Sequence, residues 1–220
     1  MIRACHRSIA RANSPPHPVF KIMKSTRPLQ VCLAAFFLAW VALAAARPED
    51  FKPEPGYVSL FNGQDLTGWG YRTNNFDGKA ASDDGRYSAT NNMLVVNPHL
   101  AEAGPRLRQL WTTREFPKDF TLKLEFRAAV NADSGIFIRK PQLQCRDYLV
   151  AGPEPYKSLK KYKPQDWNEI VVTVTNGVAH CTCNGEVLEA ALKVPETGPI
   201  GLEADRGQME YRRIRLKELP

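Results

Sequence analysis

Apolar and polar residues alternate with a period of two through much of the second half of the chain. In residues 119–127, DFTLKLEFR, the apolar positions are Phe120, Leu122, Leu124 and Phe126, and polar residues stand between them. Successive side chains of a strand point to opposite faces, so this pattern predicts a strand with one buried face. By the same reasoning we expect strands at residues 91–96, 110–116, 167–175, 178–183, 186–190, 198–204 and 209–219.

Turn residues separate these segments. Asn176-Gly177 and Asn184-Gly185 each lie between two strand-like runs, which is a strong hairpin signal. No segment has a long amphipathic helical pattern, although residues 64–69 and 153–163 could each hold a short helical turn. Many short strands with frequent turns predict an all-β sandwich.

The first 46 residues have the features of a secretory signal peptide. The apolar run of residues 29–46 follows Lys21, Lys24 and Arg27, and it ends in small residues that fit an A-x-A cleavage pattern. Met23 gives a basic leader of normal length, so residues 1–22 are interpreted as an upstream mis-start and residues 23–46 as the signal peptide. The alternative is an uncleaved membrane anchor, for which the run is short. We expect a secreted or periplasmic protein that meets the membrane only through this segment.

This division changes the interpretation of the charge. The chain has 30 Lys and Arg against 23 Asp and Glu, but residues 1–46 contain six of the basic residues and none of the acidic ones. The remainder is nearly neutral, which removes the support for a nucleic-acid-binding protein, because such a protein needs a basic face. Residues 47–55 are rich in proline and charge and are expected to be a linker, and residues 56–220 suffice for one domain.

Cysteine, histidine and tryptophan give weak chemical signals. The cysteines beyond the leader are Cys145, Cys181 and Cys183; an odd number allows at most one intrachain disulfide, and a C-x-C pair falls short of a four-ligand zinc site. We therefore expect buried apolar thiols. The histidines beyond the leader are His99 and His180, and His180 is expected to be packed. Trp69 and Trp167 are expected in the core, and Trp69 and Trp111 are also candidates for stacking on a sugar.

Six stretches, in order, resemble the 3-keto-disaccharide hydrolase domain family. They are GYVSLFNGQDLTGW, DFTLKLEFR, DSGIFIR, WNEIVVTV, CNGEVLE and GPIGLEADRGQMEYRRIRLKEL, and they span residues 56–219. The resemblance implies a concanavalin A-like jelly roll of two antiparallel sheets. It also implies an exported enzyme acting on a small-molecule glucoside or 3-keto-sugar, since family members are described as 3-keto-glucoside 1,2-lyases and 2-hydroxy-3-keto-glucal hydratases.

The implied chemistry requires few groups. A ketone at C3 acidifies the proton on C2, a base removes that proton, charge develops on the C3 oxygen, and the group on C1 departs. The enzyme needs a base near its working pH and a donor or cation for the developing charge. A divalent cation held by carboxylate and amide oxygens could serve, although no cofactor follows from the sequence.

One sheet of a jelly roll offers every second side chain to a hollow, and polar residues of the expected strands supply the candidates. Glu125 or Glu203 is interpreted as the base, and the guanidinium of Arg139, supported by Arg127, would stabilise the charge. For each candidate the alternative is a structural role, such as an exposed ion pair or a loop cap. The candidates for sugar binding are Arg127, Gln142, Gln144, Asp147 and Asp205.

One position departs from the family pattern, which commonly has Glu-x-Gln here. Gln144 and Asp147 match, whereas Gln142 stands in place of the glutamate. An amide can orient a hydroxyl but cannot accept a proton at neutral pH. A non-catalytic carbohydrate-binding module of the same fold is therefore the rival hypothesis, and a structural or adhesion sandwich is the third.

Overall fold

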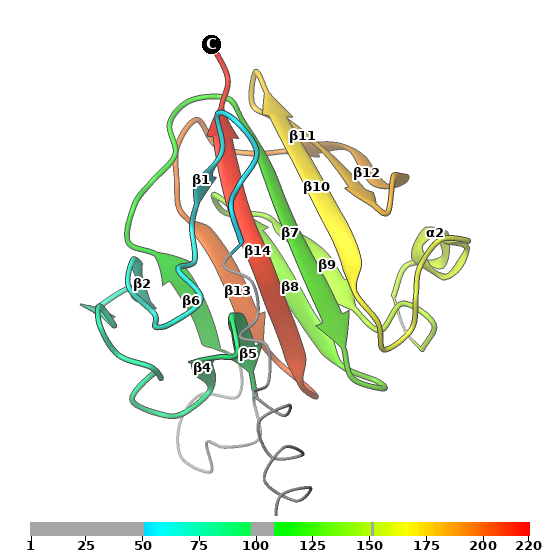
Figure 1. Ribbon diagram of the computed structural model, residues 1–220. Coiled ribbons are helices and arrows are strands. Elements are labelled where there is room, and N and C mark those ends of the chain that lie inside the picture. The colour runs from blue at the N-terminus through cyan, green and yellow to red at the C-terminus, as the bar shows by residue number, and fades with distance from the viewer. Residues whose placement is uncertain (1–50, 98–107, 151) are drawn as a thin grey trace, which may run out of the picture. The chain divides into compact units, whose positions relative to one another are not determined.

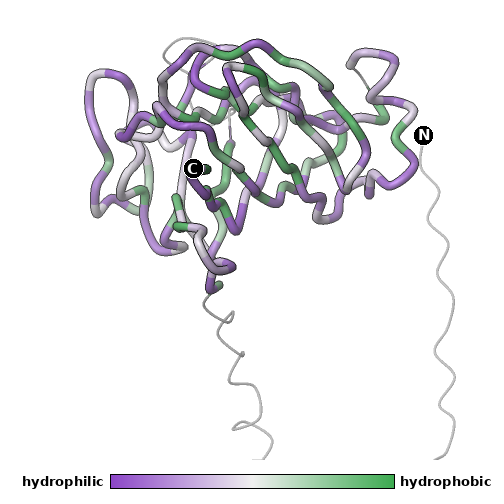
Figure 2. Tube along the Cα trace, turned by 90° about the horizontal axis from the view of Figure 1, so that it is seen from above, coloured by the Kyte–Doolittle hydropathy of each residue, from purple (hydrophilic) through white to green (hydrophobic). Residues whose placement is uncertain are grey.

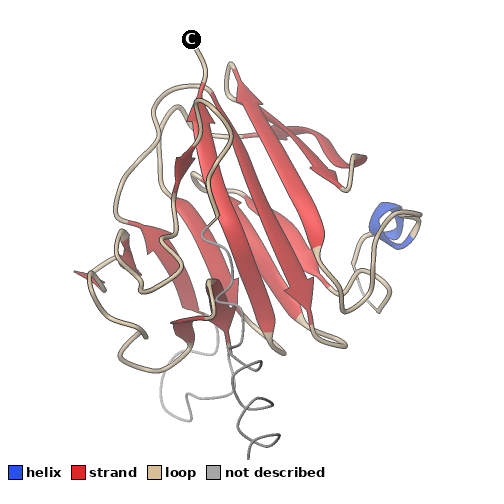
Figure 3. Cartoon of the chain, in the orientation of Figure 1, coloured by secondary structure: helices blue, strands red, loops and turns tan. Residues whose placement is uncertain are grey.

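The protein is a two-layer β-sandwich, shown in Figures 1 and 3. The computed structural model describes residues 51–97, 108–150 and 152–220, so the leader, the anchor alternative and His99 lie outside the described residues. Within these ranges no helix is long and apolar enough to cross a membrane. The one described helix is the single turn α2 (Glu154–Lys157) at the side of the sandwich.

Sheet A, the first layer, has the order β12-β11-β10-β7-β14-β5-β4, and β1 pairs with β14 at one side. All of its pairings are antiparallel. Its strands are β1 (Val58–Ser59), β4 (Tyr87–Thr90), β5 (Met93–Val96), β7 (Phe120–Ala128), β10 (Asn168–Thr175), β11 (Val178–Cys183), β12 (Glu186–Lys193) and β14 (Met209–Glu218).

Sheet B, the second layer, has the order β3-β2-β6-β13-β8-β9 and is also antiparallel throughout. The all-β class and the two antiparallel sheets expected from the sequence are therefore confirmed. Its strands are β2 (Trp69–Tyr71), β3 (Asn74–Asn75), β6 (Arg108–Thr112), β8 (Asp133–Ile138), β9 (Gln142–Arg146) and β13 (Ile200–Ala204).

The core lies between the sheets, where the period-two pattern places the apolar side chains. On β7, Leu122, Leu124 and Phe126 are completely buried and alternate with partly exposed residues, as expected. Sheet B contributes Leu110 and Leu202 from neighbouring strands, which are also completely buried. The alternation of hydrophilic and hydrophobic segments along the strands can be followed in Figure 2. Burial of these apolar faces is the main force that holds the two sheets together.

The two expected hairpins are present, but one expected helical turn is not. Asn176 and Gly177, like Asn184 and Gly185, adopt positive φ angles (50° and 74°, 47° and 80°), which is the backbone of a two-residue hairpin turn. Residues 64–69 instead form non-helical turns that lead into β2. There the Trp69 indole is buried, and its N–H donates to the Leu60 carbonyl oxygen at 2.6 Å. Burial of Trp69 was expected.

The three cysteines in the described part of the chain are buried and unpaired with one another. Burial raises the pKa of the Cys181 and Cys183 thiols to about 12, so both are neutral apolar side chains at physiological pH, as expected. Two other expectations were wrong. His180 points away from the core and is exposed, because it alternates with Cys181 on β11. Trp167 is only partly buried, because it lies on the outer face of sheet A against the guanidinium of Arg212.

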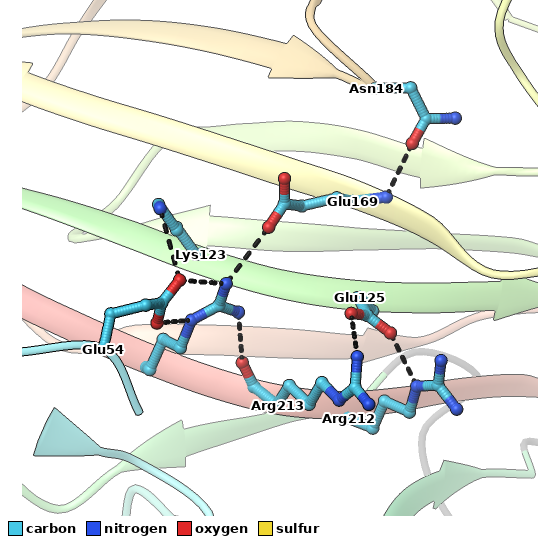
Figure 4. Close-up of polar contacts among 8 residues, drawn as sticks. Glu54, Lys123, Glu125, Glu169, Asn184, Arg212 and Arg213 are labelled. Carbon is cyan, nitrogen blue, oxygen red and sulfur yellow. Dashed lines mark hydrogen bonds and ion pairs between the residues drawn. The ribbon is translucent and has the colours of Figure 1, made fainter. Parts of the chain in front are cut away.

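The segment before β1 is bound to the outer face of sheet A. Glu54 accepts two hydrogen bonds from the buried Arg215, at 2.6 and 2.9 Å, and Lys123 lies 3.4 Å from the same carboxylate. Arg215 also donates to Glu169 at 3.1 Å. Glu54, Lys123 and Glu169 of this cluster are shown in Figure 4. The end of the expected linker is therefore bound to the domain from Glu54 onward.

We expect Glu54→Gln to lower the free energy of unfolding by about 1 kcal/mol, because Arg215 loses a paired carboxylate that is itself 44% exposed and solvent-screened. The hydrogen bonds from Arg215 depress the pKa of Glu54 from 4.5 to about 2. A depressed carboxyl pKa gives stability that is complete above pH 4.5 and is lost as pH falls through about 2. Thermal unfolding at pH 7 and at pH 2 measures this, with the exposed Glu196→Gln as control. An equal effect of Glu54→Gln at both pH values would contradict it.

Candidate functional site

Glu203 lies at the centre of the outer face of sheet B. Its neighbours Leu202 and Ala204 on β13 point into the core, so Glu203 points away from it. The register places Glu203 opposite Gln109 on β6. Although it faces outward, Glu203 is only 8% exposed, because neighbouring side chains lie against it.

Three amide side chains from two strands, β6 and β9, surround this carboxylate. Gln142 on β9 donates to Glu203 Oε2 at 2.5 Å, and Gln109 donates to Glu203 Oε1 at 3.3 Å. Gln144 Nε2 in turn donates to the side-chain oxygen Oε1 of Gln142 at 3.4 Å. The amides both position the carboxylate and offer their remaining donors and acceptors to a ligand with hydroxyl groups.

Two glycines make room for this arrangement. Gly135 on β8 separates Gln144 from Glu203 in the sheet, and a Cβ atom there would lie 2.0 Å from Gln142 Nε2. A side chain at Gly135 would therefore block the path by which Gln142 reaches Glu203. At Gly201, a Cβ atom would lie 2.7 Å from the Trp111 ring.

An aromatic pair covers Gly201. Trp111 on β6 and Phe137 on β8 flank this glycine, and their ring centroids are 5.1 Å apart. The guanidinium of Arg72 lies 4.7 Å from the Trp111 ring centroid. The face thus combines a partly exposed apolar platform with an amide-bound carboxylate, and sugars bind surfaces of this kind through stacking and hydrogen bonds.

Charged residues border the other side of the amides. Arg146 donates to the side-chain oxygen Oε1 of Gln144 at 3.0 Å and to Asp133 at 2.8 Å. The guanidinium of Arg206 lies 3.7 Å from the same Asp133 carboxylate. Two cations thus share one carboxylate beside the amide network, which leaves positive charge available to a developing oxyanion.

The environment of Glu203 favours its protonated form. Burial raises the pKa of Glu203 above its ordinary value, the amide hydrogen bonds from Gln109 and Gln142 partly oppose this, and the charges of Asp205 and Asp133 raise it further. A raised pKa makes the carboxylate a stronger base, which suits it to taking and returning a proton. Glu203 is thus the described carboxyl on this face whose environment fits a general base.

The structure brings together only part of the set expected from the sequence. Glu203, Gln142 and Gln144 lie on one face, and Asp205 follows on the same chain segment, close enough to affect the pKa of Glu203. Glu125 and Arg127 lie elsewhere, on the outer face of sheet A, because β7 pairs with β10 and β14.

Each of the separated residues has partners of its own. Glu125 accepts hydrogen bonds from Arg212 at 2.6 Å and Arg213 at 2.8 Å. Arg127 donates to Glu210 at 2.5 Å. The grouping of Glu125 and Arg127 with Glu203 in one hollow, expected from the sequence, does not occur.

Arg139 and Asp147 are buried and bonded to the protein itself. Arg139 donates to the carbonyl oxygens of Pro195 and Lys118, both at 2.6 Å, and its guanidinium lies over the Phe120 ring. Asp147 accepts a hydrogen bond from the Asn131 amide at 3.0 Å, and Tyr162 and Gln165 donate to it at 3.3 Å. These contacts connect loops to the core rather than extend toward Glu203.

Sequence reasoning missed Gln109, Phe137, Asp133 and Arg146. Gln109 lies just before the strand expected at residues 110–116. Asp133, Phe137 and Arg146 lie in segments that stood out by other residues. The available signal was the spacing of Arg146 two residues after Gln144, which places both on one face of β9.

The described residues do not form an evident cation site. Among residues 51–97, 108–150 and 152–220, no group of three or more His, Cys, Asp and Glu side chains is arranged to hold a metal ion. Both oxygens of Glu203 already accept amide hydrogen bonds.

The two-layer architecture defines a concanavalin A-like jelly-roll sandwich. The chain belongs to the 3-keto-alpha-glucoside-1,2-lyase-like domain family, whose sequence pattern matches residues 56–217. The resemblance found in the sequence is thus confirmed, and family membership gives the domain a carbohydrate-related function. A comparison with curated proteins found no match.

Two solved structures from Parabacteroides distasonis share the fold. Both are provisionally described as glycosyl hydrolases. The first is 17% identical, with a TM-score of 0.61, over 78% of this chain and 99% of the other. The second is 17% identical, with a TM-score of 0.53, over 74% and 99%. At this identity the likeness establishes the fold alone.

Proposed function

We propose that the protein cleaves 3-keto-glucosides by elimination and that Glu203 is the base. The observation that carries this proposal is the position of Glu203. It is a nearly buried carboxylate with a raised pKa, and two amides donate hydrogen bonds to it. An aromatic pair lies on the same face, where Gly135 and Gly201 have no side chain. Family membership supports the substrate class. Export through residues 23–46 is part of the same proposal.

In the first step Glu203 removes the proton from C2 of a sugar whose ring lies against Trp111 and Phe137. The electron pair of the C2–H bond moves toward the C3 ketone, and the oxygen of that ketone becomes negative. Arg146, held by Asp133 and Gln144, supplies the nearby positive charge. The ion pair with Asp133 holds the Arg146 guanidinium in place before the substrate arrives.

In the second step the enolate re-forms its ketone as the C1–O bond breaks. The products are a 2-hydroxy-3-keto-glucal and the aglycone alcohol, which takes up one proton, so the proton removed from C2 is balanced. Addition of water across the C1–C2 double bond then gives the free 3-keto-glucose. Gln109, Gln142 and Gln144 orient the sugar hydroxyls through their remaining amide groups.

A non-catalytic carbohydrate-binding module is the second candidate. The observation that favours it is Gln142, an amide at a position where the family commonly has a glutamate. In this reading the amides and the aromatic pair bind a sugar, and Glu203 only accepts hydrogen bonds.

Release of a chromogenic aglycone from a 3-keto-glucoside separates the two functions. The Gln142→Glu variant tests whether the glutamine that replaces the family's glutamate matters for activity. We expect release by the wild-type protein. In Gln142→Glu a second carboxylate would lie against Glu203, and because two like charges cannot easily coexist at that distance the pKa of the pair rises. The rate near pH 6 should fall, and the optimum should move to higher pH.

Saturable sugar binding without release would support the binding module. A large rise in rate for Gln142→Glu would place the base at position 142 and overturn the assignment to Glu203. If the protein shows no release and no binding, the result favours a structural sandwich. Val187→Glu, at an exposed position on β12 at the edge of sheet A, is a control for the added charge.

A further inference from the structure

A second face of the molecule contains a cavity that the proposed reaction does not use. It has a volume of about 730 Å³, within the usual range for small-ligand sites. Its lining comes from the segment before β1, the β1–β2 loop, the β4–β5 turn and β14. All of these lie at sheet A or its margin, whereas the Glu203 face belongs to sheet B.

The cavity lies where β14 exchanges one neighbouring strand for another. The first part of β14 pairs with β5, ending at Tyr211↔Leu94, and the last part pairs with β1, at Arg215↔Ser59. The register of β14 shifts between Arg212 and Arg215, and Arg213 has a φ of +53°. Residues other than glycine rarely adopt this backbone conformation. Bulges of this kind often change the direction of side chains at ligand sites.

The effect of the bulge is to bring two consecutive arginines to one face. Arg212 and Arg213 both line the cavity, and both donate to the single carboxylate of Glu125, as Figure 4 shows. Two positive charges thus share one negative charge. Among the described residues that line the cavity there is no Asp or Glu. The cavity therefore has an excess of positive charge together with guanidinium N–H groups suited to a carboxylate.

The rest of the lining suits a hydroxyl-rich ligand. Gln64 and Asn91 line the cavity, and neither side-chain amide is hydrogen-bonded to another residue in the described ranges. Phe51, which is partly exposed, also lines the cavity, and its ring lies 5.5 Å from the Arg213 guanidinium. Amides that bind hydroxyls beside an aromatic ring are the components from which sugar sites are built.

We propose that this cavity binds a saccharide that carries a carboxylate, such as a uronate. The carboxylate meets the guanidinium groups of Arg212 and Arg213, the hydroxyls meet Gln64 and Asn91, and one face of the ring lies on Phe51. The site is independent of the proposed cleavage at Glu203, since the two use outer faces of different sheets.

Calorimetric titration of the full chain with a galacturonate trimer tests the proposal. The same trimer with its carboxylates reduced to alcohols, and sodium sulfate, are the comparison probes. We expect saturable binding of the trimer, at least about tenfold weaker binding of the reduced trimer, and weaker binding at high salt. Equal binding of both trimers would show that the charge is not recognised, and binding of sulfate as tight as the trimer would show a simple anion site; either result overturns the proposal.

Variants with opposite expected signs locate the site. Arg213→Gln should weaken binding of the trimer about tenfold, since one charge-assisted hydrogen-bonding group is lost. Glu125→Gln should strengthen it severalfold, because it removes the carboxylate that competes for both arginines. A fold defect could imitate the first result but not the second.

Arg127→Gln is the matched control. Arg127 is also an arginine of the outer face of sheet A, is paired with a glutamate and lies near Trp167, but it does not line this cavity. Its loss, like that of Glu203→Gln, should leave binding of the trimer unchanged. Binding that is lost in Glu203→Gln and retained in Arg213→Gln would place the trimer on sheet B and sink the proposal.

Discussion

Glu203→Gln should reduce cleavage of a 3-keto-glucoside by about 10³-fold, since an amide cannot take the C2 proton and general bases typically contribute 10²–10⁴. The glutamine retains the size of the side chain and an oxygen that can accept from Gln142 or Gln109. The sugar should therefore still bind with similar affinity. Single-turnover rates together with equilibrium binding of the substrate separate the two effects.

The same variant should also be more stable than the wild type near neutral pH. A raised carboxyl pKa means that the folded protein binds the Glu203 proton more tightly than the unfolded chain does. Stability therefore falls as pH rises from the ordinary value of 4.5 through the raised pKa, and Glu203→Gln removes that loss. Melting temperatures of the two proteins should diverge as pH rises through this window.

A matched control is Glu169→Gln, which changes a carboxylate on the outer face of sheet A. It should leave the cleavage rate unchanged. Full activity in Glu203→Gln would end the assignment of the base. Lost activity with no change in the pH dependence of stability would show instead that the environment of Glu203 does not raise its pKa.

The Arg139→Gln variant should unfold more easily than the wild-type protein, but turnover by its folded fraction should be unchanged. Arg139 is 4% exposed and donates to the carbonyl oxygens of Pro195 and Lys118. A shorter side chain leaves buried acceptors without donors, at a cost of about 2–4 kcal/mol. In a domain of this size the melting temperature should fall by roughly 5–12 °C.

Arg139→Lys should recover only part of the loss, because an ammonium group cannot form the same planar fork. Turnover per folded molecule, measured below the melting temperature, distinguishes the two roles. A drop in turnover of 10²-fold or more with an unchanged melting temperature would restore the catalytic role that the sequence suggested for Arg139.

The strand pattern was predictable because it depends on local chemistry. The alternation around Leu122 and Leu124 required one buried face, and it is present in the structure. The two Asn-Gly turns required positive φ angles and have them. The helical turn expected at residues 64–69 failed because Trp69 is held by the Leu60 carbonyl oxygen and begins β2, so tertiary contacts overrode a weak local preference.

The candidate site was predictable only in part. Glu203 stands out in the sequence as a carboxylate inside an otherwise apolar strand, and Gln142 and Gln144 share one face of their strand by spacing alone. Glu125 looked equivalent, because it too is an outward-facing carboxylate on an alternating strand. Nothing in the local pattern distinguishes the outer face of one sheet from that of the other.

The sequence alone determined many of the strands with their buried faces, most of the turns and the family, since these follow from side-chain periodicity, backbone preference and ordered motifs. The tertiary structure decided which strands share a sheet. Pairing of β13 with β6 and β8 placed Glu203 among the amides, and pairing of β7 with β10 and β14 placed Glu125 against Arg212 and Arg213. Strand pairing joins residues far apart in the chain, so the neighbours that set the charge and burial of each carboxylate appear only once the sheets have formed.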